Sequence, residues 1–140
     1  LQRSYPNLVN AHLRPTCPLL SGFVVADAGA TAMMDVSDGL LRDAARIAAA
    51  SAVGLTIDLS CAAIGAAKAL LDSAAEALGV DPLGWILGGG EDHGLIATFP
   101  PKAKLAPGFA QIGTVTKGSG VTVAGGELPT DSAGWDHFGG

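Results

Sequence analysis

The order of apolar and polar residues along the chain alternates between the periods of helices and strands. Apolar residues at helical spacing predict two main helices, the second of them bent near Gly65. Alternating or continuous apolar runs predict five strands, and residues 80–94 are expected to form a loop with room for one helical turn. The predicted ranges are 37–54 and 62–79 for the helices, and 30–36, 54–60, 95–100, 109–118 and 120–125 for the strands.

These elements predict an α+β fold, in which helices pack on a mixed or antiparallel sheet. The strands near the C-terminus follow one another without helices between them, which disfavours a repeating strand–helix–strand unit. The last two strands are expected to form a hairpin across Lys117–Gly120. Prolines and Gly22 punctuate residues 1–22, so we expect a linker with one short helix there and a single folded domain over 23–140.

The composition narrows the classes of function. Hydrophobic residues make up 49% of the chain, which is enough for a core, while the net charge of −5 disfavours binding to nucleic acid or to an anionic membrane surface. An acidic chain that binds an anionic substrate needs help from a metal ion or from backbone amides. Cys17 and Cys61 lack the spacing of metal ligands, so we expect free thiols in a reducing cytoplasm.

The ends of the chain carry no predicted targeting signal. No apolar run reaches the roughly 20 residues that a membrane-spanning helix needs. The first residues lack the basic and apolar regions of a signal peptide. The sequence starts with LQRSYP, as if within a longer protein, so we expect a fragment that lacks an upstream domain.

The segment MMDVSDGL places two carboxylates where a buried strand enters a helix. Asp35 and Asp38 flank Ser37, and ligand sites gather at such strand ends. Mg²⁺ prefers one or two carboxylates together with water and phosphate oxygens, so the pair predicts a metal or phosphate site. The alternative is a helix cap, in which Ser37 or Asp38 accepts hydrogen bonds from first-turn amides. A cap does not explain Asp35.

The segment GGGEDHG over 88–94 is the second candidate. Its glycines allow backbone amides to approach a ligand closely, and Glu91 and Asp92 add two carboxylates. No Gly-Lys-Ser/Thr follows, so this is not a Walker A loop. The alternative is a mobile loop with a solvated acidic tip. His93 is either a metal ligand or, more commonly for a single histidine, a polar packing residue.

The tail DSAGWDHFGG is too rich in glycine for regular structure, yet its segment GWDHF holds two aromatic residues. Trp135 would either stack on a planar ring or clamp the tail to the core. Asp136 and His137 are adjacent, so they do not predict a catalytic dyad, and no nucleophile is identifiable. Arg14 would meet a phosphate or simply remain solvated.

Together the segments ATAMMDVSDGLLRD, GGGEDHGL and GWDHF, with HLRP before them, resemble the C-terminal half of the thiamine-monophosphate kinase family. The resemblance covers essentially the whole chain. The DVSDGL motif alone is shared with a wider superfamily that includes aminoimidazole ribonucleotide synthetase and selenophosphate synthetase. The combination of GGED with a terminal GWDHF is specific to the thiamine enzymes.

The resemblance implies a fold like the C-terminal domain of aminoimidazole ribonucleotide synthetase, and an ATP-dependent phosphorylation of thiamine monophosphate to thiamine diphosphate with Mg²⁺. It implies that Asp35 and Asp38 are Mg²⁺ ligands and that Ser37 contacts ATP. It implies that Glu91 and Trp135, with Asp92 as a weaker candidate, contact the thiamine moiety. It also implies a cytoplasmic homodimer whose active site lies in a cleft between two domains.

Two departures limit what carries over. After GGED the family often has tyrosine and then glutamate, whereas this chain has His93 and Gly94, so no role transfers to them. The N-terminal domain, which in the family carries most of the Mg²⁺ ligands, is not in this sequence, so we expect no kinase activity from the chain alone. The alternatives are another ATP-dependent member of the superfamily and a binding module for thiamine phosphates without catalysis.

Overall fold

The computed structural model describes residues 3–128 and has five helices and five strands within them, which confirms the predicted α+β class. The elements run α1 (Pro6–Leu13), α2 (Ser21–Asp27), β1 (Ala32–Val36), α3 (Leu40–Ser51), β2 (Gly54–Asp58), α4 (Ala62–Leu78), α5 (Pro82–Gly88), β3 (Gly94–Thr98), β4 (Gly113–Thr116) and β5 (Gly120–Ala124). Within this part of the chain, no helix combines the length and apolar character that a bilayer-spanning segment requires.

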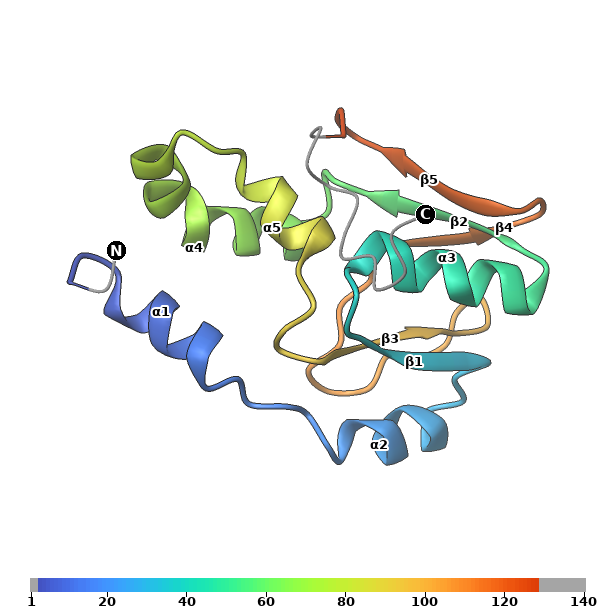
Figure 1. The fold of residues 1–140 in the computed structure, drawn as a ribbon. Coiled ribbons are helices and arrows are strands. Elements are labelled where there is room, and N and C mark those ends of the chain that lie inside the picture. Colours follow the sequence, from blue (N-terminus) through green and yellow to red (C-terminus); the bar gives the residue numbers. More distant parts are fainter. Residues whose placement is uncertain (1–2, 129–140) are drawn as a thin grey trace.

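Helix α3 lies between two small sheets (Figure 1). One sheet pairs β1 with β3 in antiparallel register, with Asp35 opposite Leu95, and the other has the strand order β4-β2-β5. The apolar face of α3 packs on both sheets, because its buried positions follow the helical repeat. The buried residues of this core are Ala44, Ile47, Ala48, Leu55 and Ile96.

A second core lies where β2, α4 and α5 meet. Its buried residues are Ile57, Leu59, Ile64 and Leu87. Helix α1 stands apart from both cores, since none of its residues is buried. Tyr5, just before α1, donates a hydrogen bond from its hydroxyl to the carbonyl oxygen of Ser73 at 2.8 Å, which ties the N-terminal segment to α4.

The predicted hairpin across Lys117–Gly120 is wrong. Strands β4 and β5 lie on opposite sides of β2, β4 antiparallel to it and β5 parallel. Strand β2 takes the centre because it is the most buried of the three, whereas β4 is mostly exposed. Thr116 and Gly120 both pair with Gly54, so the connection crosses over the start of β2. A Cβ atom at Gly54 would lie 2.6 Å from the rotatable Oγ1 of Thr116 but 3.7 Å from the nearest main-chain atoms of the connection, those of Lys117 and Ser119, so the crossing itself does not require glycine there.

Three helical features differ from the sequence predictions. Helix α3 begins at Leu40 rather than at residue 37, after Gly39 at a φ of 116°. Helix α4 is a continuous 17-residue helix through Gly65, and it ends with Gly79 in the left-handed region, as the sequence predicts. The turn expected in 80–94 is α5, whose start is capped by Asp81 accepting from the amide of Leu83.

Candidate functional site

The first acidic segment, 35–39, runs from the end of β1 to the start of α3. The side chain of Asp35 is 61% exposed, and its Oδ2 lies 3.6 Å from Nδ1 of His93. His93 directly precedes β3, the strand that pairs with β1. Asp38 is buried, and its carboxylate forms an ion pair with Arg46 of α3. Ser37 Oγ lies 3.5 Å from Asp38 Oδ1. Asp35 therefore lies at the end of β1, Ser37 and Asp38 lie in the loop that follows it, and the two carboxylates are very unequally exposed.

The fully buried carboxylate of Asp43 holds the backbone of this loop. Asp43 of α3 has no exposed surface, and its Oδ2 accepts hydrogen bonds from the amides of Ser37 at 2.9 Å and Asp38 at 3.0 Å. Its Oδ1 pairs with Arg46, which thus bridges Asp43 and Asp38. Hydrogen bonds to Asp38 and then to Asp43 raise the pKa of the Arg46 guanidinium above its usual value. The predicted cap is therefore wrong: no side chain caps α3, and Asp43, within the helix, accepts from the amides before it.

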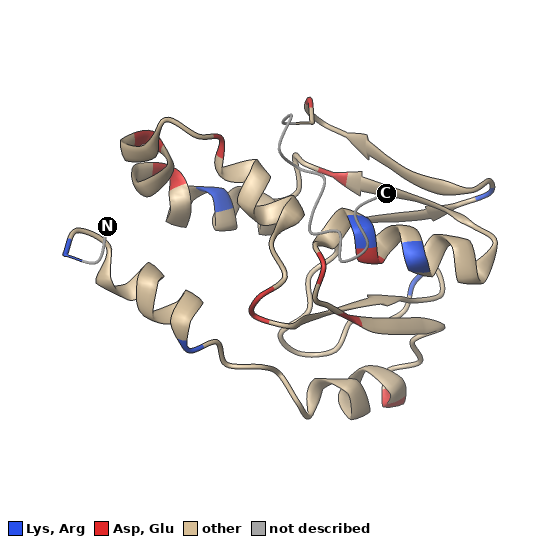
Figure 2. Ribbon diagram, viewed as in Figure 1, with Lys and Arg blue, Asp and Glu red and all other residues tan. Residues whose placement is uncertain are grey.

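The sequence prediction missed Asp43 and Arg46, although Asp43 carries a signal. It falls at the third position after Leu40 and the fourth before Ile47, on the apolar face of the helix. A carboxylate at such a position is buried and requires hydrogen-bond donors or a cation. Figure 2 shows basic and acidic positions next to one another on α3.

The second acidic segment, 88–92, packs directly against the first. A Cβ atom at Gly90 would lie 2.6 Å from the carbonyl carbon and oxygen of Ser37. A Cβ atom at Gly39 would lie 2.7 Å from the carbonyl oxygen of Gly88. Real Cβ contacts are longer than this, so the two backbones meet only because both positions are glycine. Gly90 and Gly39 therefore join the two acidic segments into one candidate site, whereas Gly89 lies against the carbonyl oxygen of Trp85 in α5.

Glu91 is held near this junction by backbone amides. Its Oε2 accepts a hydrogen bond from the amide of Gly90 at 3.1 Å. Hydrogen bonds from its own amide and that of Gly90 lower the pKa of the Glu91 carboxyl, and the charge of His12 on α1 adds to this. Glu91 is therefore ionised at neutral pH.

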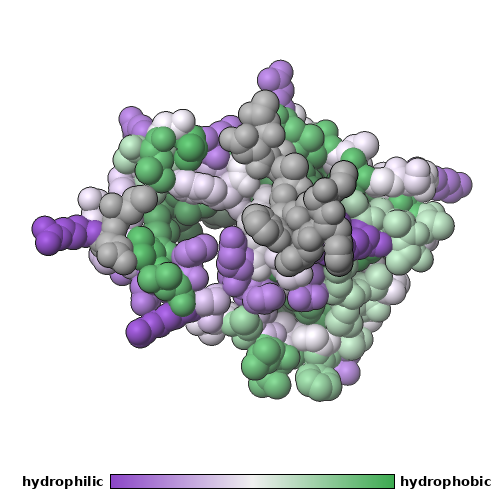
Figure 3. Space-filling model, viewed as in Figure 1, coloured by the Kyte–Doolittle hydropathy of each residue, from purple (hydrophilic) through white to green (hydrophobic). Residues whose placement is uncertain are grey.

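Asp92 lines a hollow of about 480 Å³ between the loop and α1. The other lining residues are Asn7, Asn10, Ala11, Arg14, Pro15 and Thr16. In Figure 3, hydrophilic side chains gather where α1 faces the loop after α5. The structure thus brings Arg14 and Asp92 to one hollow, although no sequence pattern connects them.

The contacts described above do not test two of the sequence predictions, the role of Trp135 and the metal site. Trp135, the predicted ring-stacking residue, lies outside the described residues. Within residues 3–128, no group of three or more His, Cys, Asp or Glu side chains is arranged to hold a metal ion. Any metal held at Asp35 and Asp38 therefore needs further ligands from elsewhere, such as phosphate oxygens or water.

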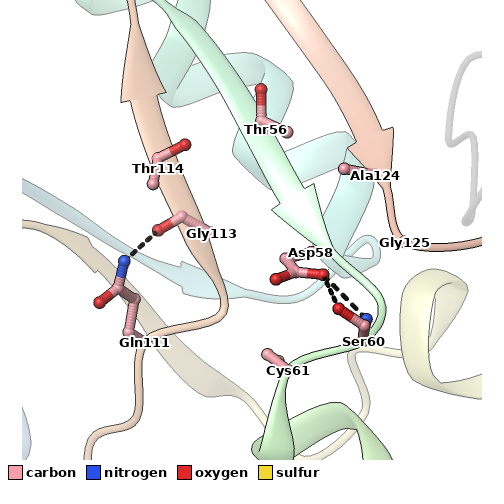
Figure 4. Close-up of a pocket in the computed structure, with 9 residues that line it drawn as sticks. All are labelled: Thr56, Asp58, Ser60, Cys61, Gln111, Gly113, Thr114, Ala124 and Gly125. Carbon is pink, nitrogen blue, oxygen red and sulfur yellow. Dashed lines mark hydrogen bonds between the residues drawn. The ribbon is translucent and has the colours of Figure 1, made fainter.

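A separate hollow of about 500 Å³ lies at the end of the three-stranded sheet (Figure 4). Asp58 Oδ1 accepts hydrogen bonds there from the hydroxyl of Ser60 at 2.6 Å and its amide at 2.9 Å. These bonds lower the pKa of Asp58. Cys61 also lines this hollow and is a free thiol, as expected. None of the residues that line it belongs to the two acidic segments.

Comparisons with known proteins find one family and several relatives that match this chain. The family described as "AIR synthase related protein, C-terminal domain" matches residues 4–126. The thiamine-monophosphate kinase of Mycobacterium tuberculosis strain H37Rv is 46% identical over 135 residues, which are 96% of this chain and 39% of the relative. The enzyme of the same name from Corynebacterium glutamicum is 40% identical over 148 residues, covering 99% of this chain and 43% of the relative.

Solved structures show the same similarity. The crystal structure of thiamine monophosphate kinase from Aquifex aeolicus superposes with a TM-score of 0.68 at 33% identity, covering 86% of this chain and 40% of that one. A structure described as AaThiL complexed with AMPPCP and TMP gives the same TM-score and identity and covers 94% of this chain and 41% of that one. This chain thus spans about two fifths of the length of the proteins it matches.

Proposed function

Because the chain belongs to the family described as "AIR synthase related protein, C-terminal domain", we propose that it is the substrate-side domain of a thiamine-monophosphate kinase. The relatives at 46% and 40% identity carry that name. The observation that carries the proposal is the close contact between the two acidic segments through Gly90 and Ser37. It joins two motifs that are far apart in sequence into one polar site.

The proposed reaction transfers the γ-phosphoryl group of ATP to a phosphate oxygen of thiamine monophosphate. A new P–O–P bond forms, the bond between the β- and γ-phosphates of ATP breaks, and ADP leaves with the electron pair. The attacking phosphate oxygen is already anionic, so the step needs no strong general base. Catalysis then consists mainly of positioning and of compensating phosphate charge. A similar structure with bound AMPPCP and TMP supports ATP and thiamine monophosphate as the two substrates.

Magnesium is the metal that this chemistry requires, and the first acidic segment fits it in part. Asp35 and Asp38 offer the one or two carboxylates that Mg²⁺ uses, and phosphate oxygens and water would complete its ligands. Asp35 is exposed and available, whereas Asp38 is paired with Arg46. Bound there, Mg²⁺ would neutralise phosphate charge. Ser37 would contact ATP beside these carboxylates.

The second acidic segment fits the other substrate. The ionised Glu91 carboxylate favours a cationic partner, and the thiazolium ring of thiamine monophosphate is a cation. Asp92 adds a second carboxylate at the adjoining hollow. Trp135 would supply a stacking face for the aminopyrimidine or the thiazolium ring.

Four further parts of the proposal concern the whole protein. We expect an N-terminal domain to complete the site with further metal ligands, a homodimer in the complete protein, and a cytoplasmic location. We also expect the 140-residue chain alone to show no turnover, because Asp35 and Asp38 would hold too little Mg²⁺ to compensate the phosphate charge, and residues 3–128 contain no group of three or more side chains arranged to hold a metal ion. An ADP-release assay with this chain checks the last point, and turnover would contradict it.

Calorimetric titration with thiamine monophosphate, in the presence of Mg²⁺ and AMPPCP, tests the assignment. We expect binding to the 140-residue chain that is lost in Trp135→Ala and weakened about tenfold in Glu91→Gln, as for a charge-assisted contact. The matched controls Trp85→Ala and Glu76→Gln should bind like the unaltered chain. Binding of an aminoimidazole ribonucleotide precursor in place of thiamine monophosphate would assign the chain to another enzyme of the superfamily. Binding of neither would contradict the substrate-side role.

A further inference from the structure

Arg46 connects two buried carboxylates, of which Asp43 also accepts hydrogen bonds from the loop amides. Its two terminal nitrogens pair with Asp43 and with Asp38. The side chain of Asp43 is fully buried, that of Asp38 is 10% exposed, and that of Arg46 is 48% exposed. One guanidinium thus joins an interior carboxylate to one at the edge of the candidate metal site.

The ion pair between Arg46 and Asp43 is the one that the fold requires. A fully buried carboxylate without a cation carries a large desolvation penalty, so Asp43 keeps Arg46 close. The other oxygen of Asp43 accepts from the amides of Ser37 and Asp38, and that oxygen is independent of what Asp38 binds. The loop backbone is therefore held in the same way whether or not Asp38 is paired with Arg46.

The contact with Asp38 is replaceable. Asp38 lies at the edge of the site, and a divalent cation on its carboxylate would compensate its charge more fully than a half-exposed guanidinium does. The guanidinium and a divalent cation cannot both dominate the same carboxylate, because the two positive charges repel each other. A side chain as long as arginine can rotate its head away from Asp38 while it stays on Asp43.

We propose that Arg46 is an exchangeable counter-ion: it neutralises Asp38 in the unliganded domain, and a divalent cation displaces it from Asp38 while it remains paired with Asp43. This inference rests on the metal-binding part of the proposed function. It makes Arg46 a positioning residue that sets the affinity of the site for metal.

The test uses Mn²⁺ alone, because its unpaired electrons broaden nearby amide resonances in NMR spectra. The isotope-labelled 140-residue chain is titrated with Mn²⁺, and the broadening of the amides of residues 35–39 gives the dissociation constant. Arg46→Gln removes the competing charge and should lower that constant roughly three- to tenfold, in line with the strength of a half-exposed ion pair. Lys117→Gln, at an exposed position in the connection between β4 and β5, is the matched control for the change in net charge.

Arg46→Lys guards against loss of folding in Arg46→Gln. An ammonium keeps a charge beside Asp43 but cannot bridge two carboxylates as a planar guanidinium does, so an intermediate increase in affinity is expected. Equal effects of Arg46→Gln and Lys117→Gln, or weaker binding in both Arg46 variants, would overturn the inference while leaving the metal site intact. Absence of Mn²⁺ broadening at 35–39 in every protein would overturn the inference together with the metal site.

Discussion

The two acidic segments of the site are held in place by different means. The first, 35–39, rests on side-chain chemistry, because the buried carboxylate of Asp43 accepts from the amides of Ser37 and Asp38. The second, 88–92, rests on backbone fit, because the missing side chain of Gly90 lets its main chain lie against Ser37. The first segment depends on the buried charge of Asp43, and the second depends on the lack of a side chain at Gly90.

This difference shows that the residues offered to a ligand are not those that determine its site. The side chains of Asp35, Glu91 and Asp92 are exposed, so we expect the fold to tolerate their substitution. Asp43 and Gly90 present nothing to a ligand, yet each fixes the main chain that carries the exposed groups. The predictions below separate the two means of support, from the largest expected effect to the smallest.

Removal of the buried carboxylate should have the largest effect. Asp43→Ala leaves the amides of Ser37 and Asp38 without an acceptor and Arg46 without its buried partner. We expect a loss of about 3 kcal/mol in the free energy of unfolding, measured by urea denaturation. Asp72→Ala is the matched control, because it breaks the exposed i,i+4 pair with Lys68 and should change stability little. Equal losses in both variants would contradict the support role of Asp43.

Addition of one methyl group should test the backbone fit. In Gly90→Ala, the new Cβ would lie 2.6 Å from the Ser37 carbonyl, so the two segments must separate. We expect a loss of about 2 kcal/mol in the free energy of unfolding, as for other overpacked positions. We also expect shifts of the Ser37 and Asp38 amide resonances.

Gly94→Ala is the control for this change, since nothing lies within 4 Å of a Cβ atom there. It should leave stability almost unchanged. If Gly94→Ala and Gly90→Ala destabilise the chain equally, the effect belongs to glycine in general and not to the contact between the segments.

The pH dependence of Glu91 is the smallest of these effects. Its folded-state pKa is lowered, first by hydrogen bonds from its own amide and that of Gly90 and then by the charge of His12. The ionised form therefore adds stability above the unfolded-state pKa, and this contribution is lost as the pH falls through the lowered folded-state pKa.

Carbon NMR of the Glu91 carboxyl, compared with the same chain unfolded in urea, measures this shift. We expect a lower pKa in the folded chain and a smaller difference in His12→Gln. A folded-state pKa at or above the unfolded-state value would show that the loop does not hold Glu91 as the structure has it.

The sequence was sufficient for the elements that depend on local periodicity. The helical spacing over α3 and the glycine that ends α4 are local signals, and both predicted elements are present. The hairpin prediction failed because strand order depends on pairing between distant segments: β2 lies between β4 and β5 and pairs with both, and no local pattern indicates this.

The site was predictable in its residue types but not in its support. Asp35, Ser37 and Asp38 were predicted from their spacing at a strand end, and the structure places Asp35 at the end of β1 and the other two in the loop after it, beside the glycine segment. The alternative that Ser37 or Asp38 caps α3 is wrong, because no side chain forms a capping hydrogen bond there and Asp43, within the helix, accepts from the amides of Ser37 and Asp38. The contact of Gly90 with Ser37 joins residues far apart in sequence, so no local pattern indicates it.

The central claim is that the two acidic segments form one substrate site, and one measurement tests it most directly. The isotope-labelled 140-residue chain is titrated with thiamine monophosphate in the presence of Mg²⁺, and amide shifts are followed over the whole sequence. We expect the amides of 35–39 and 88–92 to shift together with a single dissociation constant. Shifts confined to one segment or to the hollow around Asp58, or no shift at saturating substrate, would contradict the claim.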